Sequence, residues 1–139
     1  MSKVAIVYWS GTGNTEAMAE LVKEGVESAG GDAELIRAAD FGPDQIAGHD
    51  AFAFGCPAMG AEELEDSEFA PMWNSVELAL VDHKVALFGS YDWGTGEWME
   101  LWRKRAEDAG IEIADTVIAN LNPEGDAAEA CKELGASLV

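Results

Sequence analysis

The sequence predicts a doubly wound α/β fold, in which a five-stranded parallel sheet carries helices on both faces. Apolar runs of strand length alternate along the chain with segments of helical period, as such a sheet requires. Two of the runs, 51–54 and 85–88, are apolar on consecutive residues, which indicates strands that are covered on both faces and therefore parallel. The 139 residues are expected to form one domain, 1–139, with a core of its own.

The individual elements follow from hydrophobic periodicity. Strands are expected near 3–9, 32–37, 51–55, 84–89 and 112–119. The first helix shows apolar residues at helical spacing with acidic residues outside them: Met18, Leu21, Val22, Gly25 and Val26. A short helix is expected in part of 43–48, a longer one at about 68–80 and another at about 96–109. The last helix, 126–138, has a buried stripe that comprises Ala127, Ala130, Cys131, Leu134 and Leu138. Right-handed crossovers then bring the loops after the first, third and fourth strands to one edge of the sheet.

Composition restricts the function further. With 27 acidic and 8 basic residues the formal net charge is −19, which excludes nucleic acid and anionic membrane surfaces as partners and favours basic proteins. No apolar run approaches a membrane span and none fits a signal peptide, so a cytoplasmic protein is expected. Cys56 and Cys131 lack metal-ligand spacing and are expected to be reduced thiols, and no metal site is expected. We expect His49 and His83 on the surface.

The loop at 10–15 is predicted to bind a phosphate group. Its hydroxyl and amide side chains are those of Ser10, Thr12, Asn14 and Thr15, and its glycines are Gly11 and Gly13. The glycines let backbone N–H groups approach an anion at the start of the following helix. The loop has no lysine or arginine and matches neither the triphosphate loop nor the dinucleotide fingerprint, which favours a terminal phosphomonoester bound by neutral donors. The alternative is an ordinary turn between a strand and a helix.

Two more unusual loops follow predicted strands. They read Cys56-Pro57-Ala58-Met59-Gly60 and Gly89-Ser90-Tyr91-Asp92-Trp93-Gly94. Together with Thr-Gly-Asn-Thr at 12–15, these loops have the order and spacing found in short-chain flavodoxins of the clostridial and Megasphaera type, and the chain resembles that family over essentially its whole length. The resemblance implies the strand order 2-1-3-4-5 and non-covalently bound FMN.

The resemblance also implies a role for each loop. The 5′-phosphate of FMN would be bound by Ser10, Gly11, Thr12, Gly13, Asn14 and Thr15. Met59 and Gly60 would lie along the inner face of the flavin and its N5 edge, Glu62 would hydrogen-bond N3, and Trp93 would stack on the outer face. Residues implied to tune the potential are Met59, Gly60, Asp92 and Trp93. The other implied contacts are Pro57, Ala58, Ser90, Tyr91 and Gly94. At position 92 close relatives usually carry glycine.

The function implied is low-potential one-electron transfer, with FMN cycling mainly between semiquinone and hydroquinone, in a monomer that is not an enzyme. Implied partners are ferredoxin or flavodoxin reductases, ferredoxin-dependent oxidoreductases and hydrogenase-type donors or acceptors. The alternative is a small NAD(P)H-dependent flavin or quinone reductase, but the sequence shows no basic nicotinamide-phosphate site. A phosphorylated receiver domain would need acidic residues at Trp9-Ser10 and at Gly55-Cys56. A solvated face is expected for the acidic residues Glu62, Glu63, Glu65, Asp66 and Glu68, and packing roles for Trp9, Trp73, Trp98 and Trp102.

Overall fold

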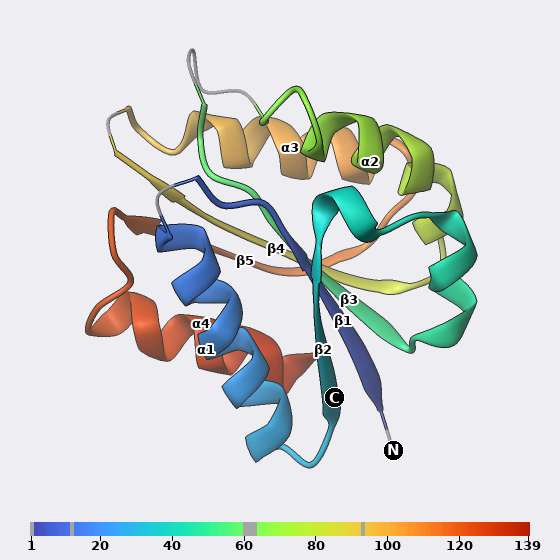
Figure 1. Ribbon diagram of the computed structural model, residues 1–139, viewed down its shortest axis with the longest axis horizontal. Helices are drawn as coiled ribbons and strands as arrows, with labels where there is room; N and C mark the ends of the chain where they lie inside the picture. Colours follow the sequence, from blue (N-terminus) through green and yellow to red (C-terminus); the bar gives the residue numbers. More distant parts are fainter. Residues whose placement is uncertain (1, 12, 60–63, 93) are drawn as a thin grey trace.

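The structure is a computed structural model that describes residues 2–11, 13–59, 64–92 and 94–139. Within these residues a five-stranded parallel sheet has the order β2-β1-β3-β4-β5, with helices on both faces (Figure 1). The strands are β1 (Lys3–Tyr8), β2 (Asp32–Arg37), β3 (Ala51–Gly55), β4 (Lys84–Tyr91) and β5 (Ile113–Asn120). The predicted fold class and strand order are confirmed.

The helices depart from the prediction in two places. The α-helices are α1 (Asn14–Ser28), α2 (Phe69–Val76), α3 (Glu97–Asp108) and α4 (Asp126–Ser137). The segment expected to be helical at 68–80 divides into α2 and a 3₁₀ turn, η3 (Glu77–Leu80). The segment at 43–48 is also a 3₁₀ helix, η2 (Pro43–Gly48), because a proline at its start and a glycine at its end leave too few residues for an α-helix.

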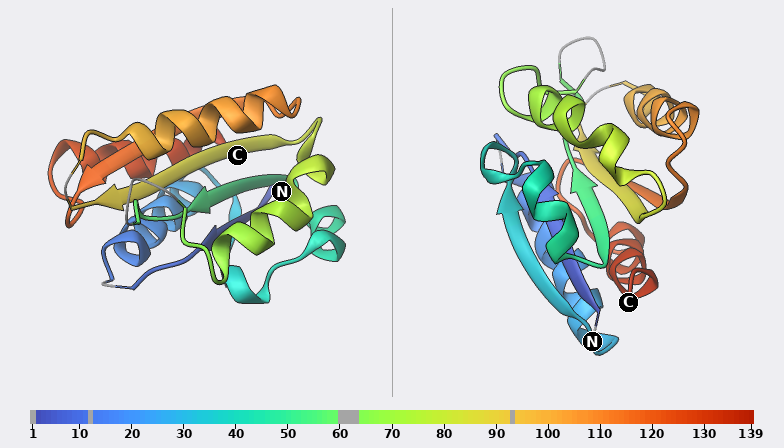
Figure 2. Two further views of the ribbon diagram at one scale, coloured as in Figure 1. Left: turned by 90° about the horizontal axis from the view of Figure 1, so that it is seen from above. Right: turned by 90° about the vertical axis from the view of Figure 1, so that its right-hand side faces the viewer.

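The sheet separates two hydrophobic layers. α2 and α3 cover one face and α1 and α4 the other, as the two further views in Figure 2 also show. β3 is buried at every residue and β1 at residues 4–7, as their consecutive apolar residues predicted. Trp73, Trp98 and Trp102 pack in the layer under α2 and α3, which confirms their predicted packing roles.

α1 and α4 contact each other at backbone distance. A methyl group at Gly25 of α1 would lie 2.0 Å from the carbonyl oxygen of Lys132 on α4. A methyl group at Gly135 of α4 would lie 2.1 Å from the carbonyl oxygen of Val22. Only glycine permits this approach. The contact holds α1 close to α4 on this face of the sheet. The N-terminal end of α1 directly follows the loop predicted to bind phosphate.

β4 extends two residues further than predicted. It pairs with β5 up to Tyr91, which lies opposite Asn120, so Ser90 and Tyr91 belong to the strand rather than to the following loop. The sequence suggested an earlier end because Gly89 and Ser90 are poor strand formers. Pairing with β5 on one side outweighs this weak local preference.

The expectation that His49 lies on the surface is wrong. Its side chain is only 5% exposed, with Nδ1 2.9 Å from the carbonyl oxygen of Gln45 and Nε2 2.8 Å from a carboxylate oxygen of Glu34. Its ring also lies against that of Phe52. His83 is half-buried, and the centroid of its ring lies 5.5 Å from that of the Phe52 ring. Long-range contacts, of His49 with Glu34 of β2 and of His83 with Phe52 of β3, therefore hold both imidazoles inward.

Both cysteines are free thiols, as predicted, and both are buried. Among the described residues, no helix is long and apolar enough to span a bilayer. In the same part of the chain, no cluster of histidine, cysteine and carboxylate side chains could hold a metal ion.

Candidate functional site

The loops after β1, β3 and β4 meet at the carboxyl edge of the sheet. They enclose a cavity of about 190 Å³. Eight of its lining residues were predicted from the sequence: Gly11, Asn14, Pro57, Ala58, Met59, Ser90, Tyr91 and Asp92. Two others, Trp9 and Leu121, were not predicted as site residues. The sequence prediction that these loops lie side by side is confirmed.

Hydrogen bonds join the three loops into one unit. The hydroxyls of Thr15 and Ser90 are 3.0 Å apart, which links the first loop to the end of β4. The N–H of Ala58 donates to the carbonyl of Ser90 at 3.0 Å, and the N–H of Trp9 donates to that of Gly55 at 3.0 Å. Because each loop is bonded to a strand or to another loop, the cavity walls are held by the sheet.

The first loop is folded around the hydroxyl of Ser10. Its Oγ accepts hydrogen bonds from the N–H of Gly13 at 3.0 Å and from that of Glu16 at 3.3 Å. Gly13 has a φ of 96°, a left-handed conformation that glycine adopts at no steric cost. Because both bonds use oxygen lone pairs, the Ser10 hydroxyl keeps its own proton for donation to an anion. Asn14 begins α1 and lines the cavity.

Several predicted site residues are not tested by this geometry. Thr12, Gly60, Glu62 and Trp93 lie outside the described residues, so their roles stay predictions. Thr15 is buried and bonded to Ser90, and its predicted contact with phosphate also stays a prediction. Gly94 is exposed, with a φ of 102°.

A basic residue near the first loop was missed by sequence reasoning. Arg37, the last residue of β2, lies opposite Tyr8 in the sheet register. It lines a hollow of about 270 Å³ together with Tyr8, Ser10 and Glu16. Burial, and then the Glu16 carboxylate, raise the pKa of Tyr8, whereas Arg37 acts to lower it. The signal available in the sequence was the position of Arg37 at the carboxyl end of the predicted strand 32–37.

The acidic segment is not uniformly solvated, so that expectation is wrong for Glu65. Its side chain is buried, and its carboxylate accepts bonds from the N–H groups of Ser67 at 2.7 Å and of Glu68 and Phe69 at 2.8 Å. The Ser67 hydroxyl donates to it as well. Burial acts to raise the pKa of Glu65, but these hydrogen bonds outweigh it and the pKa lies below its usual value. Glu65 therefore fastens the segment to the start of α2, whereas Asp66 is exposed.

Trp9 has a second function besides packing. It is half-buried against the core, as predicted, but its indole N–H donates to the carboxylate of Glu68 at 2.9 Å. It lines both the 190 Å³ cavity and the adjacent 270 Å³ hollow. Trp9 therefore borders both spaces, and its hydrogen bond to Glu68 holds the orientation of its ring.

Cys56 is a structural residue of the second loop. Its Sγ accepts the N–H of Glu65 at 3.4 Å, and its carbonyl accepts the indole N–H of Trp98 at 3.2 Å. Burial raises the pKa of the thiol to about 12. The thiol is therefore neutral at physiological pH and gives the site no nucleophile.

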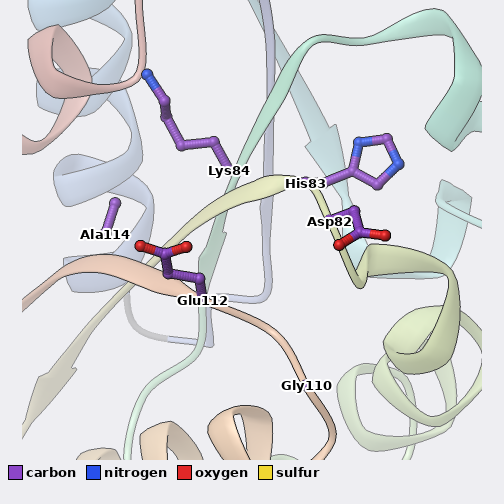
Figure 3. Close-up of a pocket in the computed structure, with 6 residues that line it drawn as sticks. All are labelled: Asp82, His83, Lys84, Gly110, Glu112 and Ala114. Atoms are coloured by element: carbon purple, nitrogen blue, oxygen red, sulfur yellow. The ribbon is translucent and has the colours of Figure 1, made fainter.

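A larger hollow, of about 430 Å³, lies at the opposite edge of the sheet. Figure 3 shows that its polar side chains diverge: His83 and Asp82 point to one side, and Lys84 and Glu112 to the other. Binding sites in doubly wound sheets lie outside the carboxyl ends of the strands, whereas Lys84 begins β4. Size alone would select this hollow, but the divergent groups and the position favour the smaller cavity.

The fold and the cavity define a class of protein: a doubly wound α/β protein that binds a phosphorylated ligand at the carboxyl edge of its sheet. Hydroxyl and amide donors at the start of α1 suit the phosphate end. Beside them, Trp9, Ala58, Met59, Tyr91 and Leu121 supply an aromatic and aliphatic wall that suits a flat ring.

Comparison with known proteins gives the family. Residues 6–135 match the family model for flavodoxin. The flavodoxin of Megasphaera elsdenii is 52% identical over 132 residues, 95% of each chain, and that of Clostridium beijerinckii is 42% identical over 130 residues, 94% of each. The solution structure of two-electron reduced Megasphaera elsdenii flavodoxin superposes with a TM-score of 0.91, at 50% identity and 97% coverage of both chains. The chain belongs to the flavodoxin family.

Membership confirms the resemblance found in the sequence motifs. The protein is an electron carrier that binds FMN non-covalently, and it is not an enzyme that turns over a substrate. The alternative of a small NAD(P)H-dependent reductase is therefore not supported. The donor set and the partly aromatic lining of the cavity fit this cofactor.

Proposed function

We propose that the chain is a low-potential electron carrier whose three joined loops bind FMN in the residue-by-residue arrangement that the sequence implies. The observation that carries the proposal is the cavity itself, where the phosphate-type loop, residues 57–59 and the end of β4 are hydrogen-bonded to one another. FMN, when bound, accepts and releases single electrons.

The phosphate end is assigned to the first loop. Ser10 and Asn14 donate hydrogen bonds, Gly11 and Gly13 allow close approach of the backbone, and Thr12 and Thr15 complete the set. The N-terminus of α1 adds its partial positive charge. Arg37 lies in the adjoining hollow and adds a long-range attraction for the dianion.

The ring end is assigned to the second and third loops. Met59 and Trp93 lie on the two faces of the ring, Pro57 and Ala58 support the inner side, and Tyr91 adds to the wall. Gly60 would turn its carbonyl toward N5 only when reduction places a proton on that atom, and glycine at position 60 would allow this rotation at low cost. Glu62 would accept a hydrogen bond from N3–H. Ser90 holds the first and third loops together.

The low potential is attributed to negative charge near the cavity. Asp92 lines it, and Asp66 is exposed on the neighbouring segment. A unit negative charge at about 6 Å, with an effective dielectric constant of 20, opposes addition of another by roughly 3 kcal/mol. Acidic side chains at this edge of the sheet therefore make the reduced carrier a stronger reductant.

The phosphate assignment is tested by comparing FMN with riboflavin. Asn14→Leu removes a donor from the predicted phosphate site and is expected to weaken FMN by about 1.5–3 kcal/mol, the range for hydrogen bonds to charged groups, and to leave riboflavin nearly unchanged. Asn122→Leu is the matched control, since Asn122 is exposed on the loop after β5 and does not line the cavity. Equal losses for both flavins in a fluorescence-quenching titration would contradict the assignment.

The proposed partners are redox proteins with a basic face around their own centre, such as ferredoxin or flavodoxin reductases, ferredoxin-dependent oxidoreductases and hydrogenase-type proteins. The net charge of −19 supports this choice, because opposite charges speed association at low salt by one to three orders of magnitude. A monomer acting in the cytoplasm is part of the same proposal.

We infer that partners dock on the face at the carboxyl edge of the sheet, where the cavity and the acidic segment lie, and rates of electron transfer at several salt concentrations test this. Neutralising Glu63 and Asp66 as Glu63→Gln and Asp66→Asn should flatten the salt dependence. An equal change in charge at the opposite edge, Asp32→Asn with Glu112→Gln, should have a smaller effect. Glu65 is excluded from the first set because it is buried and bonded to α2. Stopped-flow rates that respond equally to both pairs would show that the charge acts globally and not through this face.

A further inference from the structure

We propose that Asn120, the last residue of β5, is a positioning residue for the third loop and thereby sets how tightly FMN is bound. Its Nδ2 donates to the carbonyl of Tyr91 at 3.2 Å and to that of Asp92 at 3.2 Å. The N–H of Leu121 donates to the Tyr91 carbonyl as well, at 2.8 Å. The proposal rests on the proposed function, since it assigns to β5 the control of a loop that contacts the cofactor.

The three bonds lie where the regular ladder ends. β4 and β5 pair up to Tyr91 opposite Asn120, and beyond this point the strand bonds stop. Asn120 is exposed, so water could satisfy either carbonyl separately. A carboxamide has two N–H donors on one rigid group, and it can fix the two carbonyls relative to each other and to β5. Asp92 is followed in the sequence by Trp93, the residue predicted to stack on the flavin.

The conformation of Leu121 supports the same conclusion independently. Its φ is 59°, a left-handed conformation that is costly for a residue with a branched side chain, and it is 46% exposed. Backbone strain of this kind persists only where neighbouring contacts enforce it, and it is frequent at binding sites. Here the strained residue donates its N–H to the Tyr91 carbonyl and is one of the residues that line the cavity. An unfavourable backbone conformation is thus held in place at the point where β5 meets the third loop.

Two substitutions at position 120 remove the hydrogen-bond donors while keeping a side chain of similar size. Asn120→Leu removes both donors, and Asn120→Asp replaces them with oxygens that face the two carbonyls. We expect each variant to bind FMN about 5- to 20-fold more weakly, the effect of one or two lost hydrogen bonds. Riboflavin should weaken by the same factor because the phosphate loop is untouched. The control is Asn122→Leu, two residues further along, whose side chain does not line the cavity.

The readouts include two that a merely structural role would not move. One is the visible circular dichroism of bound flavin, which reports the surroundings of the ring, and the other is the equality of the FMN and riboflavin losses. Urea unfolding of the apoprotein should change little in either variant. Unchanged affinity and dichroism, a loss confined to FMN, or an equal loss in Asn122→Leu would overturn the proposal. Failure of the parent protein to bind FMN would instead refute the proposed function.

Discussion

Glu65 should contribute to stability through its charge, although it lies in a segment that the sequence indicates as a solvated acidic face. Its carboxylate accepts three backbone N–H groups and the Ser67 hydroxyl at the start of α2. Glu65→Gln keeps one oxygen for Glu68 and Phe69 but turns an NH₂ group toward the backbone N–H of Ser67, which then loses its acceptor. The loss of a charged acceptor is expected to lower the free energy of unfolding by about 1.5–3 kcal/mol at pH 7.

The effect should depend on pH with a definite sign. The folded-state pKa of Glu65 lies below its usual value, so the ionised form is favoured in the folded protein. Its contribution is therefore fully present above the unfolded pKa of about 4.3 and is lost as pH falls through the lower folded value. Protonated glutamate resembles glutamine, so the difference between parent and Glu65→Gln should shrink as pH falls from 5 toward 3.

Urea unfolding of the apoprotein, followed by tryptophan fluorescence at several pH values, measures this difference. Asp66→Asn is a suitable control because it also removes one negative charge, at an adjacent and exposed position. It should change stability by about 0.5 kcal/mol or less. A Glu65→Gln variant as stable as the parent at pH 7, or a deficit that stays constant down to pH 3, would refute the stabilising role of the Glu65 charge.

Three further predictions concern other parts of the molecule. Gly25→Ala should destabilise the protein by about 1–3 kcal/mol or more in chemical denaturation, because the new methyl group would lie 2.0 Å from the Lys132 carbonyl and force α1 and α4 apart. Arg37→Gln should weaken FMN more than riboflavin, with a smaller difference at high salt, since Arg37 lies in the hollow that contains Ser10 and acts through its charge; equal titration curves at low salt would refute this. Cys56, with its pKa raised to about 12 by burial, should react with a thiol reagent at pH 8 only as fast as the protein unfolds, and rapid labelling of the folded protein would show that the thiol is accessible.

The parts of the fold that sequence predicts well are those determined by local patterns. β1, β3 and β4 are apolar on consecutive residues, which is sufficient to indicate parallel strands covered on both faces. The three loops were identified because each combines residues of unusual chemistry with a position directly after a strand. Right-handed crossovers then place such loops together whatever their sequence, and this is why most of the cavity lining was anticipated.

What the sequence could not show depends on contacts between distant segments. His49 meets the Glu34 carboxylate of β2 only in the folded chain, and the backbone N–H of Glu65 meets the thiol of Cys56 after β3 in the same way. Arg37 reaches the phosphate loop through the pairing of β2 with β1. Asn120 is an ordinary strand end until the register of β5 against β4 is known. Each of these roles is set by a hydrogen bond or contact that no local pattern encodes.

The hydroxyl pair of Thr15 and Ser90 makes the two ends of the binding site interdependent. Thr15 belongs to the first turn of α1, near the predicted phosphate end, and Ser90 to the strand that leads into the loop at the ring end. Ordering either end therefore reduces the conformational entropy that the other must lose when its own part of the ligand binds. Such coupling is reciprocal by thermodynamic necessity. The whole nucleotide should consequently bind more tightly than the separate affinities of its phosphate and its ring would give.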